Sequence, residues 1–149
     1  MRLARLALAA LFLATAGGAG AQQFPVRTYG LADGLPQTRV NAIAEGPRGY
    51  VWFATQGGVS RFDGAEFVTF TSQEGLPRNY VSDIAIDRRG RVWAATANGV
   101  AVLEGGRFRA IGGSAVGGYI PTLAVDHDRV WIATPDDGAR VYDGARGRR

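Results

Sequence analysis

Residues 34–59 read GLPQTRVNAIAEGPRGYVWFATQGGV, and residues 75–100 read GLPRNYVSDIAIDRRGRVWAATANGV. The offset between the two segments is 41 residues, and it also carries Phe67 onto Phe108. A third, weaker copy follows at an offset of 39, with one residue deleted before Trp131. A fixed period of this length is typical of repeat architectures, in which one unit cannot bury its apolar face alone.

Apolar and polar residues alternate within each copy, which predicts β-strands and not helices. In the first copy we expect strands at residues 40–45, 50–55, 59–62 and 66–70, separated by turns that contain glycine. Four short strands joined in this way form one blade of a β-propeller. We therefore predict an all-β fold of about two and a half to three four-stranded propeller blades, which form an incomplete ring.

The repeats divide the chain into five segments. These are a signal peptide (1–21), an isolated outer strand that would close the last blade (22–33), repeat 1 (34–74), repeat 2 (75–113) and an incomplete repeat 3 (114–149). Within the second segment, residues 26–31 align with the outer strand of repeat 1, but no inner strands precede them. Two and a half blades would leave unpaired edges, so we interpret the chain as a fragment or a truncated product. The alternative is a ring closed by several short chains.

The three tryptophans, Trp52, Trp93 and Trp131, occupy one position of the repeat. Aromatic side chains can form sugar platforms or cation cages. The simpler interpretation is that one large ring per blade fills the wedge between neighbouring sheets, which also explains why the position is shared.

Residues 1–21 have the outline of a secretory signal peptide. Arg2 and Arg5 form the basic start, residues 6–16 form an apolar core, and small residues precede the expected cleavage site after Ala21. The apolar core is shorter than the roughly 20 residues that span a bilayer, although an uncleaved anchor is the alternative. We predict a periplasmic or secreted mature chain.

Every basic residue is an arginine, and the chain has no lysine and no cysteine. Of the 17 arginines, two lie in the signal peptide and three in the last four residues, which leaves 12 against 13 acidic residues, a net charge of −1. Because a nucleic-acid interface needs a clustered basic patch, we expect no nucleic-acid partner. The absence of cysteine excludes disulfides and thiol chemistry.

Candidates for catalysis or metal binding are few. His127 is the sole histidine and lies between Asp126 and Asp128, which could indicate a metal site or a general base. Neighbouring residues on a turn point in different directions, so a solvated turn histidine is the preferred interpretation. The pair Asp136 and Asp137 lacks the number of oxygen ligands that calcium requires. We predict no catalytic residue, no metal and no cofactor.

The loop that leads into the first strand of each blade is the better candidate for ligand contact. It should lie at a propeller rim near the central channel, where propellers generally bind ligands. Its sequence varies between copies and offers hydrogen-bonding and stacking groups for an oligosaccharide or another small polar molecule. The candidate ligand-binding residues are Arg39, Arg78, Asn79, Tyr80 and Tyr119. The alternative is that they are ordinary exposed loop residues.

The unit Gly-Leu-Pro, Val-x-x-Ile, Gly-x-Val-Trp-x-Ala-Thr, Gly-Val and Phe resembles the two-component regulator propeller repeat. It runs from Gly34 to Phe67, again from Gly75 to Phe108, and in weaker form over residues 119–144. The third copy departs from the pattern, because Ser-Ala-Val at residues 114–116 stands where Gly-Leu-Pro is expected.

The resemblance implies the sensor region of a bacterial signalling receptor, which commonly precedes a transmembrane helix and a histidine kinase or diguanylate cyclase. The parent protein would then be membrane-anchored, and this chain would bind a ligand without catalysing a reaction. Two alternatives stay open, namely an enzyme fragment resembling the streptogramin lyases and a secreted protein-interaction scaffold. The open blade edges could also support self-association.

Overall fold

The structure is a computed structural model that describes residues 24–143. The predicted signal peptide lies outside the described residues, as does the end of repeat 3. Within residues 24–143 no helix is long and apolar enough to cross a membrane.

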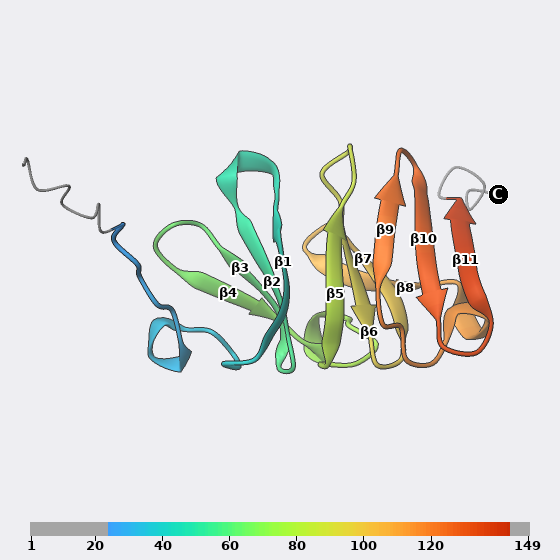
Figure 1. Cartoon of the computed structure of the whole chain (residues 1–149), viewed down its shortest axis with the longest axis horizontal. Helices are drawn as coiled ribbons and strands as arrows, with labels where there is room; N and C mark the ends of the chain where they lie inside the picture. The colour runs from blue at the N-terminus through green and yellow to red at the C-terminus, as the bar shows by residue number, and fades with distance from the viewer. Residues whose placement is uncertain (1–23, 144–149) are drawn as a thin grey trace, which may run out of the picture.

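Eleven strands form three antiparallel sheets, each of which follows the order of the chain (Figure 1). Blade 1 contains β1 (Val40–Glu45), β2 (Val51–Thr55), β3 (Gly58–Phe62) and β4 (Phe67–Phe70). Blade 2 contains β5 (Val81–Ile86), β6 (Val92–Thr96), β7 (Gly99–Glu104) and β8 (Arg107–Ile111), and blade 3 contains β9 (Leu123–Asp126), β10 (Arg129–Thr134) and β11 (Gly138–Asp143). The helical elements of this region are four 3-10 turns: η1 (Leu31–Asp33), η2 (Pro47–Gly49), η3 (Ser72–Glu74) and η4 (Gly113–Val116). The prediction of propeller blades in an unclosed ring is confirmed.

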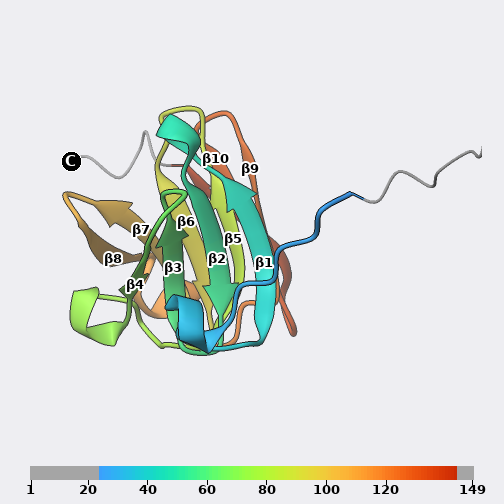
Figure 2. The same cartoon turned by 90° about the vertical axis from the view of Figure 1, so that its left-hand side faces the viewer.

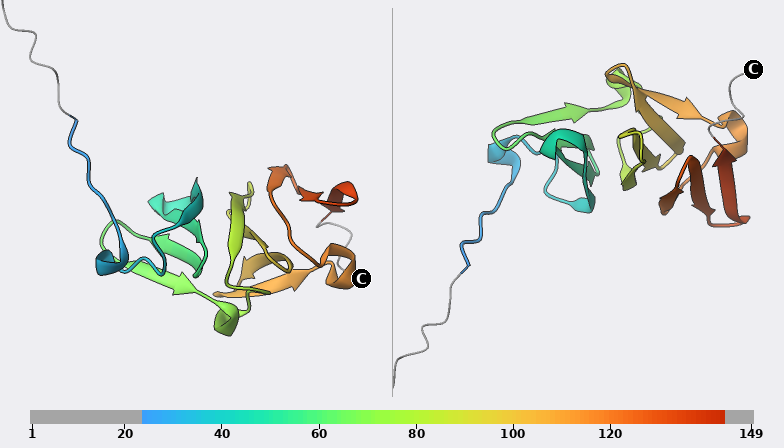
Figure 3. Two further views of the ribbon diagram at one scale, coloured as in Figure 1. Left: turned by 60° about the horizontal axis from the view of Figure 1, so that its bottom comes forward. Right: turned by 90° about the horizontal axis from the view of Figure 1, so that it is seen from above.

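The blades stand in a row with their inner strands β1, β5 and β9 adjacent. Seen from above, the outer strands β4 and β8 follow one another along one side of the row (Figure 3). Blades 1 and 2 share their strand register, because Val40 pairs with Thr55 as Val81 pairs with Thr96. The sequence repeat is therefore also a structural repeat.

A threonine near the end of the second strand closes the same turn in every blade. The hydroxyl groups of Thr55, Thr96 and Thr134 donate to the carbonyl oxygens of Gly58, Gly99 and Gly138, at 2.8, 2.8 and 3.0 Å. In blades 1 and 2 the same oxygen also accepts a backbone N–H two residues on, from Gly57 and Asn98. Threonine suits this position because its β-branched side chain favours the strand and its hydroxyl group forms hydrogen bonds with backbone groups of the turn.

Two apolar cores fill the wedges between the blades. The core between blades 1 and 2 contains Trp52 with Phe70 and Ile84, and the core between blades 2 and 3 contains Trp93 with Ile120 and Ile132. The prediction that tryptophan fills the wedge holds for Trp52 and Trp93. It does not hold for Trp131, which is exposed because the described residues contain no blade beyond blade 3.

η1 lies at the lower end of blade 1, and the segment before it runs away from the sheets (Figure 2). Residues 24–30 form no strand. The ring of Tyr29 nevertheless packs on Phe67 with centroids 5.8 Å apart, close to the 5.7 Å between Phe70 and Phe108 one repeat later. Tyr29 thus has the place of an outer-strand aromatic residue. Whether this segment completes a further blade stays a prediction.

Candidate functional site

The predicted contact residues lie at the rim where the chain approaches the inner strands, at the lower side of Figure 1. Arg39, Tyr80 and Tyr119 occupy the same position in three successive repeats. The turns that follow β2, β6 and β10 lie at this rim as well, because the Ala97 N–H donates to the Tyr80 carbonyl oxygen at 3.0 Å. The rim is therefore built from two loops of each blade.

The Gly-Leu-Pro segment shapes the loop before β5. Gly75 has a left-handed φ of 99°, and a Cβ atom there would lie 2.0 Å from the Phe108 carbonyl oxygen. Only glycine fits such a conformation and such a close approach. Leu76 is then buried in the core between blades 1 and 2, and its N–H donates to the Thr71 carbonyl oxygen at 3.1 Å. The backbone before the variable residues 78–80 is therefore anchored to the core and to the neighbouring strand.

A repeated side-chain hydrogen bond sets the spacing of successive blades at this rim. The Asn41 amide donates to the Val81 carbonyl oxygen at 2.7 Å, and one repeat later the Ser82 hydroxyl donates to the Ile120 carbonyl oxygen. Since Tyr80 directly precedes Val81 and Tyr119 directly precedes Ile120, these bonds also place the candidate aromatic residues.

The structure brings Tyr80 and Tyr119 together, with ring centroids 6.3 Å apart and planes at 65°. Tyr119 is exposed and Tyr80 half-buried, so both rings can receive a ligand. Arg39 and Arg78 are exposed and make no ion pair within residues 24–143. Asn79 differs from the others, because its side-chain oxygen accepts the Ser72 N–H at 2.7 Å and thereby holds η3.

His127 lies at the opposite rim, on the turn between β9 and β10, and its side chain is exposed. Its ring bonds to the Asp126 carboxylate, which also accepts from Arg129 at 2.8 Å. The bond to His127, and then that to Arg129, lowers the pKa of Asp126. Asp128 instead pairs with Arg89 of blade 2 at 3.0 Å. In the described part of the chain, no three histidine or acidic side chains converge on a metal position.

Asp87, the counterpart of Asp126 in repeat 2, is a buried carboxylate in the turn between β5 and β6. It accepts the Trp93 indole N–H at 3.0 Å, the Arg91 Nε–H at 2.6 Å and the backbone N–H groups of Arg89 and Arg91, both at 2.9 Å. Burial acts to raise the pKa of Asp87, but these hydrogen bonds outweigh it and hold the pKa below the ordinary value. The only sequence signal was the arginine four residues later.

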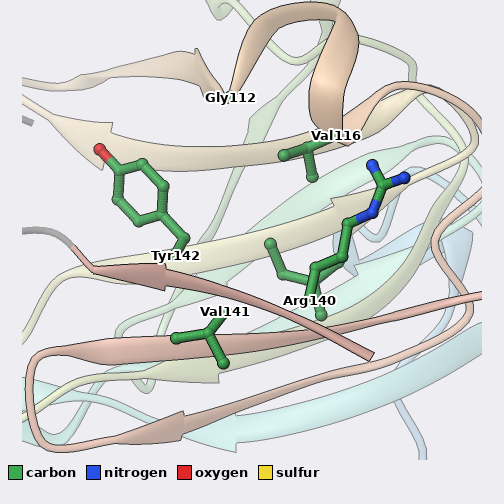
Figure 4. A pocket seen from close by; sticks show the side chains of 6 residues that line it. Gly112, Val116, Arg140, Val141 and Tyr142 are labelled. Atoms are coloured by element: carbon green, nitrogen blue, oxygen red, sulfur yellow. The ribbon is translucent and has the colours of Figure 1, made fainter. Parts of the chain in front are cut away.

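A hollow of about 570 Å³ lies between η4 and β11, lined by Gly112, Val116, Ile132 and residues 140–142 (Figure 4). In blades 1 and 2 the third strand is covered at this edge by β4 and β8. No strand pairs with the outer edge of β11 among the described residues. The hollow is thus the place of a fourth strand, and we do not count it as a ligand site.

Comparison with known proteins agrees with this architecture. The sequence profile described as two component regulator propeller matches residues 34–57 and 75–98. The chain carries two-component regulator propeller repeats. These matches end at the turn after β2 and after β6, and each includes the rim loop and the tryptophan strand. No curated protein matches the chain significantly.

Several solved structures share the fold of this chain. The extracellular domain of BT3049 from B. thetaiotaomicron, described as a hybrid two component system, is 20% identical with a TM-score of 0.61 over 79% of this chain and 19% of its own. The extracellular domain of BT4673 from the same organism, described as a one component system, is 18% identical with a TM-score of 0.65. The match covers 80% of this chain and 16% of that one. PorZ of Porphyromonas gingivalis, a surface component of the type-IX secretion system, is 21% identical with a TM-score of 0.54. The match covers 70% of this chain and 17% of PorZ. The chain thus spans less than a fifth of each of these chains, and the likeness establishes the fold.

Proposed function

We propose that the chain is the ligand-sensing propeller portion of an extracytoplasmic bacterial receptor, of the two-component histidine kinase or diguanylate cyclase type. The regulator propeller repeats and the likeness to extracellular domains of such systems support this proposal. Its role is binding and not catalysis. Ligand binding would act by shifting the population of propeller conformations against a downstream module.

The ligand site of this proposal is the rim formed by Arg39, Tyr80 and Tyr119. The observation that carries it is the contact between Tyr80 and Tyr119, two aromatic residues at one variable position of an otherwise regular frame. Two rings at 65° offer a stacking face and phenolic hydroxyl groups, and an exposed arginine lies at the same position of repeat 1. This chemistry suits an oligosaccharide or another small polar molecule.

The ligand proposal is tested by screening the mature chain on an oligosaccharide array and measuring each hit by calorimetry. We expect Tyr80→Ala and Tyr119→Ala each to weaken binding by at least about tenfold, since stacked aromatic residues dominate such contacts. Tyr80→Phe should retain most of the affinity. Arg39→Ala should also weaken binding. Its matched control is Arg88→Ala, which removes an exposed arginine at the opposite rim and should leave the affinity unchanged.

Two outcomes would contradict the binding proposal. Turnover of a bound molecule that is lost in His127→Ala would indicate an enzyme. Capture of a protein partner with no small-molecule binding at the rim would indicate an interaction scaffold.

The extracytoplasmic location has a separate test. Residues 1–24 fused to an alkaline phosphatase that lacks its own signal should give phosphatase activity in a bacterial host, and the mature product should begin at Gln22. Replacing a leucine in the apolar core with arginine should abolish export, because signal peptides depend on that core. Activity retained in the arginine variant would argue against the signal peptide.

A further inference from the structure

A second hollow, of about 220 Å³, lies between blades 1 and 2 at the rim opposite the tyrosine pair. Blade 1 lines it with Arg48, Tyr50, Trp52 and Arg61, and blade 2 closes it with Gly90 and Leu103. Its volume is about seven times the share of one water molecule in the liquid. It can therefore hold a small ligand or one end of a larger ligand.

Positive charge gathers around this hollow without an acidic partner. The guanidinium carbon of Arg61 lies 4.6 Å from the centre of the Tyr50 ring and 5.9 Å from that of Trp52. The guanidinium carbon of Arg48 lies 5.4 Å from the Tyr50 ring. Within residues 24–143 neither arginine forms an ion pair. Cation–π contacts orient the two arginines but leave their hydrogen-bonding capacity largely unused.

Two residues that line this hollow each carry a buried donor that has no acceptor in the described part of the chain. They are the indole Nε1–H of Trp52 and the Nε–H of Arg61. Trp52 is only 4% exposed, so its N–H is removed from bulk water. Leaving a buried donor unsatisfied costs about 1–3 kcal/mol, which makes the coincidence of two such donors beside one hollow informative.

Repeat 2 shows how the same two kinds of donor are satisfied. The Trp93 indole N–H and the Arg91 Nε–H both donate to one carboxylate oxygen of Asp87, at 3.0 and 2.6 Å. As in repeat 1, the guanidinium lies over the indole, with its carbon 5.0 Å from the Trp93 ring centre. A carboxylate is thus the natural acceptor for an indole and a guanidinium in this arrangement.

Repeat 1 cannot supply that carboxylate from the same position. The counterpart of Asp87 is Gly46, and a Cβ atom there would lie 2.6 Å from Trp52 Nε1. Any side chain at this position would therefore collide with the indole. The guanidinium comes from a different place as well, since Arg61 replaces the counterpart of Val102.

We propose that the hollow between blades 1 and 2 binds the carboxylate of a small acidic molecule, which accepts from Trp52 and Arg61 as Asp87 accepts from Trp93 and Arg91. Arg48 also lines the hollow and adds a second positive charge beside Tyr50. Charge-assisted hydrogen bonds to a partly desolvated carboxylate are the strong ones, so one group of this kind can anchor a ligand. The site is separate from the tyrosine rim. Experiments can therefore refute the carboxylate site without refuting ligand binding at the rim, and the reverse.

The test follows the indole N–H signals of the mature chain by two-dimensional NMR. Glucuronate and acetate should move the Trp52 signal and leave the Trp93 signal in place, because Asp87 already occupies the Trp93 donor. Glucose and acetamide, which lack the negative charge, should move neither signal. Phosphate is the third arm, and a shift with phosphate but with neither carboxylate would overturn the assignment to carboxylates.

Arg61→Val installs the residue that repeat 2 has at this position, and it should weaken glucuronate binding by at least about tenfold through loss of a charge-assisted hydrogen bond. Arg109→Val is the matched control, because Arg109 is exposed on the outer strand β8 and repeat 1 has Val68 at this position, and this variant should bind as the unchanged chain does. If Arg61→Val does not fold, Arg61→Gln keeps a polar side chain and removes its charge. Undiminished binding in a folded Arg61 variant, or no response of Trp52 to either carboxylate, would refute the proposal.

Discussion

Asp87 shows how one side chain can connect a turn, a strand and a core. Its carboxylate accepts four N–H groups, including the indole of the buried Trp93. We expect Asp87→Asn to lower the free energy of unfolding by about 2 kcal/mol, because an amide nitrogen cannot accept these donors. Asp126→Asn is the matched control at the same repeat position, and it should cost much less stability because its ion pairs are open to solvent. Urea denaturation of both variants measures the difference, and equal losses would contradict this role of Asp87.

The same residue predicts how stability depends on pH. Its pKa is lowered in the folded state from an ordinary value of 3.8, so its contribution is complete above that value and is lost as the pH falls through the folded pKa. We therefore expect the melting temperature of the unchanged chain to fall more steeply than that of Asp87→Asn as the pH is lowered below about 4. Parallel pH profiles in circular dichroism melts would show that Asp87 is not responsible.

At the scale of single elements, the threonine that closes the turn after the second strand is the repeated device. Thr96 is fully buried, and its hydroxyl serves both the Gly99 carbonyl oxygen and the Asn98 N–H. We expect Thr96→Val to cost about 2 kcal/mol of stability, since two backbone groups lose their partner while the shape of the side chain is kept. Thr134→Val in blade 3 should cost less than half as much, because that turn is open to water. Urea denaturation measures both losses, and equal shifts of the two midpoints would contradict the prediction.

At the scale of the whole molecule, the row of blades formed by residues 24–143 has two open ends. Ile43 on blade 1 is 62% exposed while its counterpart Ile84 is 6% exposed, and Trp131 on blade 3 is 42% exposed while Trp93 is 1% exposed. The two faces are the counterparts of those that pack together in each wedge. We therefore expect the mature chain to self-associate in a concentration-dependent way, which sedimentation velocity would detect.

Trp131→Arg should shift that equilibrium towards the monomer, because a charge on the open face opposes burial. Val68→Arg is the matched control, since Val68 is 41% exposed on the outer strand and repeat 2 carries Arg109 at this position. Self-association that Val68→Arg weakens as much as Trp131→Arg would mean that the open face is not the contact.

Much of the architecture follows from the pattern of single repeats. The alternation around Trp52 and the Gly-Leu-Pro segment before β5 predict strands and turns, because strand direction and left-handed glycine conformations are properties of short stretches of chain. The position of the rim residues follows from the same pattern. The contact between Tyr80 and Tyr119, and the use of Asn79 to hold η3, could not be predicted, since each depends on how separate segments meet.

The sequence by itself determined the period, the strands and the side of the sheet to which each residue points. Only the tertiary structure decided what each residue meets there. Trp93 and Trp131 have the same place in the repeat, yet one is buried and the other exposed. Asp87 is likewise buried, whereas Asp126 is half-buried. The physical reason is that burial is a property of the neighbouring blade. Repeat 1 shows this most directly. The alignment shows that Gly46 stands in place of Asp87, but only the structure shows that the Trp52 and Arg61 donors have no acceptor in the described part of the chain.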